Sequence, residues 1–173
     1  PKGRVFIHSH LGATDIDDIF AKLRYIIVGC ECKWVVVDHL HMLVNVLAEG
    51  DERRGIDMLM NRLRSLVEET GVGMILVSHW RRASGDKGHE QGIEVSLSHL
   101  KGSQGIAQLS DCVIALERNQ QASNEDEANT TKVRVLKSRY TGDTGLACSL
   151  RYNNDTGRLF EVSEEETFDN TEF

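Results

Sequence analysis

The sequence predicts an α/β fold in which a parallel sheet is extended by antiparallel hairpins. Two short apolar segments, WVVV at residues 34–37 and VGMILVS at residues 72–78, are typical of strands buried on both faces of a parallel sheet. A strongly periodic helix lies between them, at residues 51–69. Residues 132–162 alternate strand patterns with polar, glycine-containing turns, which is typical of hairpins. We therefore expect the parallel part to precede the antiparallel part along the chain.

Further elements follow from local patterns. Apolar or alternating segments predict additional strands at residues 5–10, 112–117, 132–138, 146–152 and 158–162. Apolar residues at helical spacing predict additional helices at residues 15–28 and about 103–110. Loops are expected at residues 40–50, 80–95 and 119–129. Since helices alternate with buried strands, the pattern fits a RecA-like P-loop NTPase core.

Composition sets few limits on function. With 40% hydrophobic and 27% charged residues, the 173-residue chain has an ordinary globular composition, and no apolar run approaches the length that spans a bilayer. The four cysteines show no zinc-site spacing, so we expect reduced thiols in a cytoplasmic protein. The net charge of −7 is concentrated in residues 161–173, which hold six acids and no base. Acidity therefore does not exclude nucleic-acid binding.

Two polar side chains end the predicted buried strands. Asp38 follows WVVV, and His79 follows the next strand. The carboxyl ends of parallel strands meet at one sheet edge, where α/β proteins bind nucleotides. An aspartate there can hold Mg²⁺, directly or through water, and a histidine one strand over can contact a γ-phosphate. We expect both residues to be catalytic.

Cations near the hairpins suggest contacts with a nucleotide. Lys137 and Arg139 are two residues apart on a predicted strand, so both are expected to face the same side. A cation there could reach a neighbouring subunit's γ-phosphate, as an arginine finger does. Arg118 follows one strand and Tyr152 ends another, and a guanidinium and a phenol could hold a flat base between them.

The polar segment at residues 80–95 is a candidate DNA-binding loop. It contains Arg81, Arg82 and Lys87 among several glycines. Glycines allow backbone N–H groups to approach an anion, and cations supply charge. This composition is suited to the phosphate backbone of single-stranded DNA.

The phosphate loop of such ATPases, GxxxxGK[ST], occurs nowhere in the chain, which starts at Pro1. We expect a fragment that begins inside a domain. Residues 1–162 would form a partial RecA-like domain that lacks the phosphate loop, and residues 163–173 an acidic disordered tail. By itself the chain is expected to have negligible NTPase activity.

Several segments closely resemble the helicase domain of the bifunctional primase-helicases of short-tailed bacteriophages. These enzymes are ring-shaped relatives of DnaB-type and mitochondrial replicative helicases. The resemblance covers nearly the whole chain from about residue 15 to residue 173, and its segments are DHLHMLVNVLAEGDERRGIDMLMNRLR, DKGHEQG, GSQGIAQLSDCVIALERNQQ and KSRYTGDTGLA. The acidic tail that ends in Phe173 is also similar to the tail of that family.

The resemblance implies a role for each candidate residue. Asp38 is similar to the Walker B acid, His79 to the γ-phosphate sensor, and Arg139 to the arginine finger that acts across the subunit boundary. Arg118 and Tyr152 match the residues on either side of the base.

The resemblance also implies ligands and partners. Arg81 and Lys87 match the central DNA-binding loop, and Phe173 with the preceding acids matches a tail that contacts the DNA polymerase. The expected assembly is a hexameric ring on single-stranded DNA, with Mg²⁺ and a nucleoside triphosphate, dTTP or ATP, in the cytoplasm of a bacterial host if a phage encodes the chain.

Two other functions stay open at this point. A RecA-like recombinase would share the fold, although KSRYTGDTG and ALERNQQ favour the helicase. The chain could instead be a non-catalytic module that docks a polymerase through its acidic tail.

Overall fold

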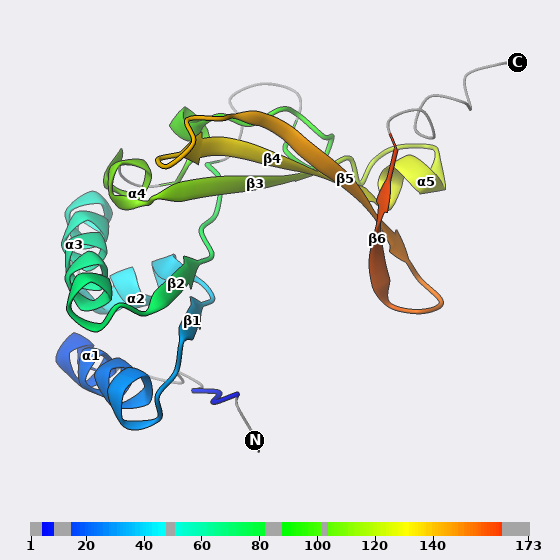
Figure 1. Ribbon diagram of the computed structural model, residues 1–173. Helices are drawn as coiled ribbons and strands as arrows, with labels where there is room; N and C mark the ends of the chain where they lie inside the picture. Colours follow the sequence, from blue (N-terminus) through cyan, green and yellow to red (C-terminus); the bar gives the residue numbers. More distant parts are fainter. Residues whose placement is uncertain (1–4, 9–14, 48–50, 82–87, 102–103, 164–173) are drawn as a thin grey trace, which may run out of the picture. The chain divides into compact units, whose positions relative to one another are not determined.

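The computed structural model describes residues 5–8, 15–47, 51–81, 88–101 and 104–163 (Figure 1). The chain divides into two compact units. Unit 1 comprises residues 1–80 and 100–109, and unit 2 comprises residues 81–99 and 110–173. None of the helices in the described part of the chain combines the length and the apolar character that crossing a bilayer requires.

Unit 1 contains helices around a short parallel strand pair. Its elements, in order, are α1 (Ile16–Arg24), the π-helical turn η1 (Tyr25–Gly29), β1 (Trp34–Val37), α2 (Leu40–Leu47), α3 (Glu52–Thr70), β2 (Gly73–Leu76) and α4 (Gln104–Leu109). Strands β1 and β2 pair in parallel from Trp34 opposite Gly73 to Val37 opposite Leu76. The predicted parallel pairing is therefore confirmed.

The long helix α3 begins and ends where its sequence predicts. The Asp51 carboxylate accepts a hydrogen bond from the Arg54 N–H at 3.0 Å and caps the first turn. Gly71 adopts a φ of 68° at the end, a left-handed conformation that favours glycine. Apolar side chains at helical spacing form the buried face: Ile56, Leu59, Met60, Leu63 and Leu66. The predicted helices at residues 15–28 and about 103–110 also form, as α1 with η1 and as α4.

Burial of β1 and β2 differs from the prediction. Val35 is buried, but the side chains of Trp34, Val36 and Ile75 are 68%, 63% and 50% exposed. The prediction that both strands are buried on both faces is wrong for the described residues, because each strand has one partner strand and packing on one face. The Trp34 indole lies against Gly73, where a Cβ atom would collide with the ring. Because Gly73 has no Cβ atom, Trp34 and Gly73 can lie opposite each other as the first residue pair of the two strands.

Two other sequence-based assignments are corrected. Residues 5–8 have no regular secondary structure and no pairing strand among the described residues, and Val5 and Ile7 are 82% and 90% exposed, so the predicted strand at residues 5–10 does not form in this part. Residues 40–47 form helix α2 and not a loop. Leu40, Leu43 and Val44 are buried, and α2 packs against α3. Tertiary packing therefore decides the structure of a short apolar segment that lacks a polar face.

Unit 2 is built on an antiparallel sheet. Its strands β3 (Cys112–Arg118), β4 (Thr130–Ser138), β5 (Gly145–Asn153) and β6 (Arg158–Val162) pair in the order of the chain. The short helix α5 (Glu125–Ala128) lies within the predicted loop at residues 119–129, and the 3₁₀ turn η2 (Leu97–His99) precedes the return to unit 1. The predicted hairpins are confirmed. Among the described residues they form a sheet of their own and do not extend the β1–β2 pair, so the chain combines a parallel and an antiparallel sheet.

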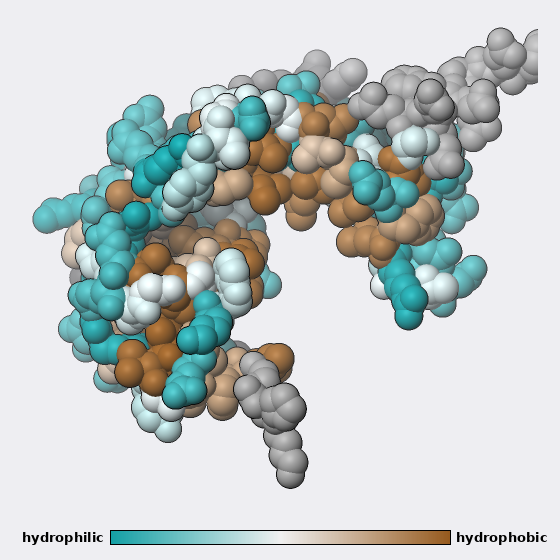
Figure 2. All heavy atoms as spheres, in the orientation of Figure 1, coloured by the Kyte–Doolittle hydropathy of each residue, from teal (hydrophilic) through white to brown (hydrophobic). Residues whose placement is uncertain are grey.

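The faces of β3 differ in burial. Val113, Ala115 and Glu117 are buried, whereas Ile114 and Leu116 are 57% and 64% exposed. Figure 2 shows apolar side chains gathered over β3 and β4. Alternation of this kind indicates a sheet that is packed mainly on one face.

A buried carboxylate connects β3, β4 and the preceding segment of unit 2. The Glu117 side chain is 3% exposed, and its Oε1 accepts hydrogen bonds from the Val95 N–H and from Arg134 Nε, both at 2.9 Å. Arg134 also pairs with the exposed Glu94 at 3.2 Å. The hydrogen bond to Glu117 raises the pKa of Arg134. Because a buried carboxylate is costly without partners, this pair holds residues 94–95 on the sheet.

Replacing Arg134 with methionine should destabilise the chain strongly. Arg134→Met leaves the Glu117 carboxylate buried with the Val95 N–H as its one remaining partner among the described residues, and breaking such a pair costs about 3 kcal/mol or more. The free energy of unfolding in urea, followed by far-ultraviolet circular dichroism, measures the loss. The control Glu94→Gln removes only the exposed partner and should cost less than about 1 kcal/mol. Equal losses for the two variants would contradict the assigned role of Glu117.

Candidate functional site

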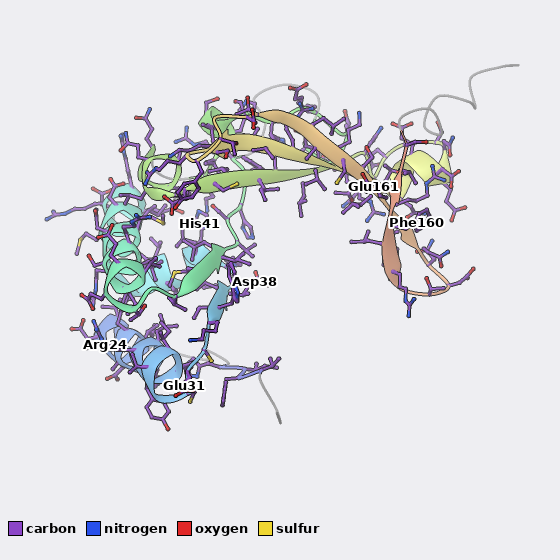
Figure 3. All side chains as sticks on the ribbon, viewed as in Figure 1. Arg24, Glu31, Asp38, His41, Phe160 and Glu161 are labelled. Atoms are coloured by element: carbon purple, nitrogen blue, oxygen red, sulfur yellow. The ribbon has the colours of Figure 1, made fainter. Side chains whose placement is uncertain are left out.

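Asp38 and His79 lie at the carboxyl ends of paired strands, as predicted. Asp38 directly follows β1 (Figure 3). His79 follows β2 by three residues. The backbone extends the pairing past both strands, because the Val77 N–H donates to Val37 O and the Leu40 N–H donates to Val77 O, each at 2.9 Å. Both side chains are exposed. An acid and an imidazole are thus presented at one edge of unit 1.

Three histidine rings gather at this edge. The ring centroids of His39 and His79 are 4.2 Å apart, those of His41 and His79 are 5.6 Å apart, and those of His39 and His41 are 6.1 Å apart. His39 comes directly after Asp38, and His41 lies in the first turn of α2. The cluster therefore combines residues from the ends of both strands.

His41 is the buried member of this cluster, with 6% of its surface exposed. Its Nε2 lies 3.2 Å from the Lys101 carbonyl oxygen, and its Nδ1 is buried without a hydrogen-bond partner among the described residues. Burial lowers the pKa of His41. The ring is therefore neutral at neutral pH, with the proton on the nitrogen that faces the carbonyl.

In unit 2, Lys137 and Arg139 reach the same short segment. Lys137 Nζ donates to the Ser110 carbonyl oxygen at 2.8 Å, and Arg139 Nη1 pairs with the Asp111 carboxylate at 2.8 Å. The Arg139 N–H also donates to the Asp111 carbonyl oxygen at 2.8 Å. Arg139 follows the last residue of β4 instead of lying within the strand. The two cations therefore bond to adjacent residues, Ser110 and Asp111.

Arg118 and Tyr152 converge on one residue of unit 2. Arg118 Nε donates to the Ala128 carbonyl oxygen at 2.5 Å, and its Nη2 donates to Asn129 Oδ1 at 3.1 Å. The Tyr152 N–H donates to the Asn129 carbonyl oxygen at 2.9 Å. The Tyr152 side chain is 39% exposed. Asn129 therefore bonds to the predicted guanidinium of Arg118 and to the backbone of Tyr152, which come from different strands.

Of the predicted DNA-contacting residues, the structure describes Arg81. Its side chain is exposed, its N–H donates to the His99 carbonyl oxygen at 2.8 Å, and its own carbonyl oxygen lies 2.6 Å from His89 Nε2. Arg82, Lys87 and Phe173 lie outside the described residues. Their assigned roles stay predictions.

Sequence reasoning missed three residues that position this chemistry. His41 lies in α2 and contacts the His79 ring. Asp111 pairs with the Arg139 side chain, and Asn129 accepts a hydrogen bond from the Arg118 side chain. The DHLH string offered a signal for His41, since two histidines two residues apart follow a strand end. Asp111 and Asn129 gave no local signal, because their partners are 28 and 11 residues away.

Comparison with known proteins relates most of the chain to one family. The DnaB-like helicase C-terminal domain family matches residues 2–161. A DNA helicase/primase of Enterobacteria phage T3 is 41% identical over 153 residues, which are 88% of this chain and 26% of that protein. The chain thus spans about a quarter of the length of this relative.

Solved structures show the same fold. A DnaB-like replicative helicase, solved in a study of its interactions with primase, is similar with a TM-score of 0.68 and 19% identity over 86% of this chain and 36% of that one. A KaiC-like protein from Pyrococcus horikoshii OT3 is similar with a TM-score of 0.57 and 15% identity over 86% of this chain and 57% of that one. These likenesses confirm the predicted RecA-like α/β fold.

Stability should depend on pH through His41. Because burial lowers the pKa of His41 in the folded chain, the unfolded chain takes up the proton first, at its ordinary pKa of 6.5. Wild-type unfolding free energy should therefore fall relative to that of His41→Gln as the pH decreases through about 6.5. Urea unfolding of both proteins in chelator-treated buffers on either side of this pH measures the difference. A difference that does not change with pH would contradict this role of His41.

Proposed function

Because the chain belongs to the family of DnaB-like helicase C-terminal domains, we propose that it is the C-terminal part of a ring-shaped replicative DNA helicase. In the intact protein, this helicase couples hydrolysis of a nucleoside triphosphate to translocation on single-stranded DNA. The observation that supports the proposal most directly is the placement of Asp38 and His79 at one edge of the β1–β2 pair. The relative from phage T3 supports the primase-helicase type.

Asp38 is the proposed Mg²⁺ residue of this site. Its carboxylate is exposed directly after β1, so its oxygens can be reached from solution. Carboxylate oxygens are ligands that Mg²⁺ prefers, and one carboxylate can hold the ion, directly or through water, without a full protein cage. The residues present therefore fit the ion. When bound, Mg²⁺ offsets the negative charge of the phosphates of dTTP or ATP.

His79 is the proposed contact to the γ-phosphate. Its exposed imidazole follows β2, and its ring lies 4.2 Å from the ring of His39, the residue after Asp38. A hydrogen-bonding group is thus one strand away from the group that holds the metal. A γ-phosphate at this edge could contact both groups, so His79 could distinguish a triphosphate from a diphosphate.

Arg139 is proposed to act on a nucleotide bound by the neighbouring subunit, with Lys137 as a second nucleotide contact. The Arg139 side chain is 44% exposed, and its partner Asp111 is 31% exposed. Ion pairs of this exposure contribute about 1 kcal/mol or less. Arg139 can therefore exchange Asp111 for a phosphate at little cost, which is what an arginine finger requires.

Arg118 and Tyr152 are the proposed contacts to the base. Asn129 holds both residues, through the guanidinium of the first and the backbone of the second. Because Arg118 is fixed by two hydrogen bonds, its planar group has a defined orientation against which a base could stack.

The remaining assignments complete the proposed assembly. DnaB-like helicases act on DNA and form oligomers, and we propose a hexameric ring for the intact protein. Arg81, Arg82 and Lys87 would contact single-stranded DNA. Residues 163–173 would form the acidic tail that contacts the DNA polymerase through Phe173, next to a partial RecA-like domain at residues 1–162. The proposed site of action is the cytoplasm of a bacterial host.

Mixed rings of the intact protein test the proposed roles of Arg139 and Asp38. Arg139→Ala should lower the rate of hydrolysis by at least about 10³-fold and leave nucleotide binding largely intact, because the finger stabilises a neighbour's transition state. Asp38→Ala should also inactivate the ring. Mixing the two inactive proteins should restore some activity, because some interfaces then contain both residues. Steady-state phosphate release measures it, and no gain at any mixing ratio would contradict action across the interface.

Measurements of DNA binding by the intact protein test whether the loop at residues 80–95 contacts single-stranded DNA. Lys87→Ala should weaken binding to single-stranded DNA and reduce the slope of log affinity against log salt by about 0.7, the value for one lost phosphate contact. Fluorescence anisotropy at several salt concentrations measures both quantities. The control Lys22→Ala removes an exposed cation of α1 and should leave the slope unchanged. An unchanged slope for Lys87→Ala would remove the loop from the DNA-binding surface.

A further inference from the structure

We propose that His39, His41 and His79 form a binding site for a divalent transition-metal ion of the Zn²⁺ class. One ring nitrogen of each histidine lies within 4.8 Å of those of the other two. Zn–N bonds are about 2.0–2.1 Å long, so three nitrogens around one tetrahedral ion lie roughly 3.3 Å apart. The longest separation must therefore shrink by no more than about 1.5 Å, which small ring rotations can provide.

His41 already has the form that a metal ligand requires. A carbonyl oxygen only accepts hydrogen bonds, so the contact with Lys101 O at 3.2 Å fixes the proton on Nε2 and leaves the lone pair on Nδ1. That Nδ1 is buried and has no hydrogen-bond partner among the described residues. Metal-binding histidines commonly donate their other nitrogen to a backbone carbonyl, which orients the ring. A bound ion would satisfy the Nδ1 atom.

The other two histidines complete the site from the strand ends. His39 Nδ1 is also buried without a partner among the described residues, whereas the His79 side chain is exposed. An exposed ring can rotate toward an ion and leaves that side of the site accessible. The cationic Lys101 nearby is paired with Glu52 at 3.1 Å, which offsets its repulsion of a second cation. Three nitrogens with an accessible fourth position suit Zn²⁺ with a bound water.

The proposed site differs from the proposed Mg²⁺ site in its chemistry. Mg²⁺ prefers oxygen ligands such as the Asp38 carboxylate, whereas imidazole nitrogens favour Zn²⁺, Co²⁺ and Ni²⁺. The inference rests on the geometry of unit 1 and does not require the proposed helicase function. If His79 also contacts a γ-phosphate, an ion held by the three rings would compete with that contact.

Metal titration of the metal-free 173-residue chain tests the proposal. Zn²⁺ is added in competition with a chromophoric chelator, and Co²⁺ is added separately to record its visible absorption. We expect one tight site per chain and the intense bands of tetrahedral Co²⁺. His79→Gln should weaken Zn²⁺ binding at least about tenfold and should remove those bands. Because His79 is exposed, this variant should fold, and His39→Gln should show the same loss.

Two controls separate this site from other ligands in the chain. The double variant His89→Gln and His99→Gln removes another histidine pair, whose rings are 6.0 Å apart, and should bind Zn²⁺ as tightly as the wild type. The double variant Cys30→Ser and Cys32→Ser removes two thiols and should also retain the site. The proposal is overturned if the wild type shows no saturable site, if His79→Gln binds equally well, or if loss of the thiols abolishes binding.

Discussion

The register of the β1–β2 pair is the constraint on which the chemistry of unit 1 depends. Side chains alternate along a strand, so a shift by one residue would reverse every side chain of β2 relative to β1. Val37 lies opposite Leu76, and backbone hydrogen bonds continue through Val77 to Leu40. These bonds fix the starting point of α2 and hence the position of His41. The buried helices stabilise unit 1, and the hydrogen bonds of the short strand pair fix the positions of the residues at its edge.

Unit 2 positions its cations by a different principle. There, Arg118 of β3, Lys137 of β4 and Arg139, the residue after β4, bond to acceptors in connecting segments: Ser110 and Asp111 accept from Lys137 and Arg139, and Ala128 and Asn129 accept from Arg118. In each case a backbone or side-chain oxygen restricts the rotamer of the cation. Arg139 is 44% exposed and its partner Asp111 31% exposed, so exchange of this carboxylate for another anion costs little.

The sequence was most informative where a local rule decides the structure. The period of α3, the position of Asp38 and His79 after the paired strands, and the hairpin turns could all be predicted. Helix α2 could not, because a short apolar segment without a polar face is stabilised by packing on α3. Burial of the strands was overestimated, since it depends on how many neighbours a sheet has. Partners such as Asn129 depend on contacts between distant segments.

The two tryptophans give the chain a built-in probe of one unit. Trp34 begins β1 beside Gly73, Trp80 follows His79 and pairs with Leu100, and both belong to unit 1. Indole emission, excited where tyrosine does not absorb, therefore reports on the strand pair and its edge, whereas circular dichroism reports on both units. If the units unfold separately, the two signals will have different midpoints, and a two-state treatment will not apply. Spectroscopy of the unaltered chain can therefore reveal whether its two sheets form one cooperative structure.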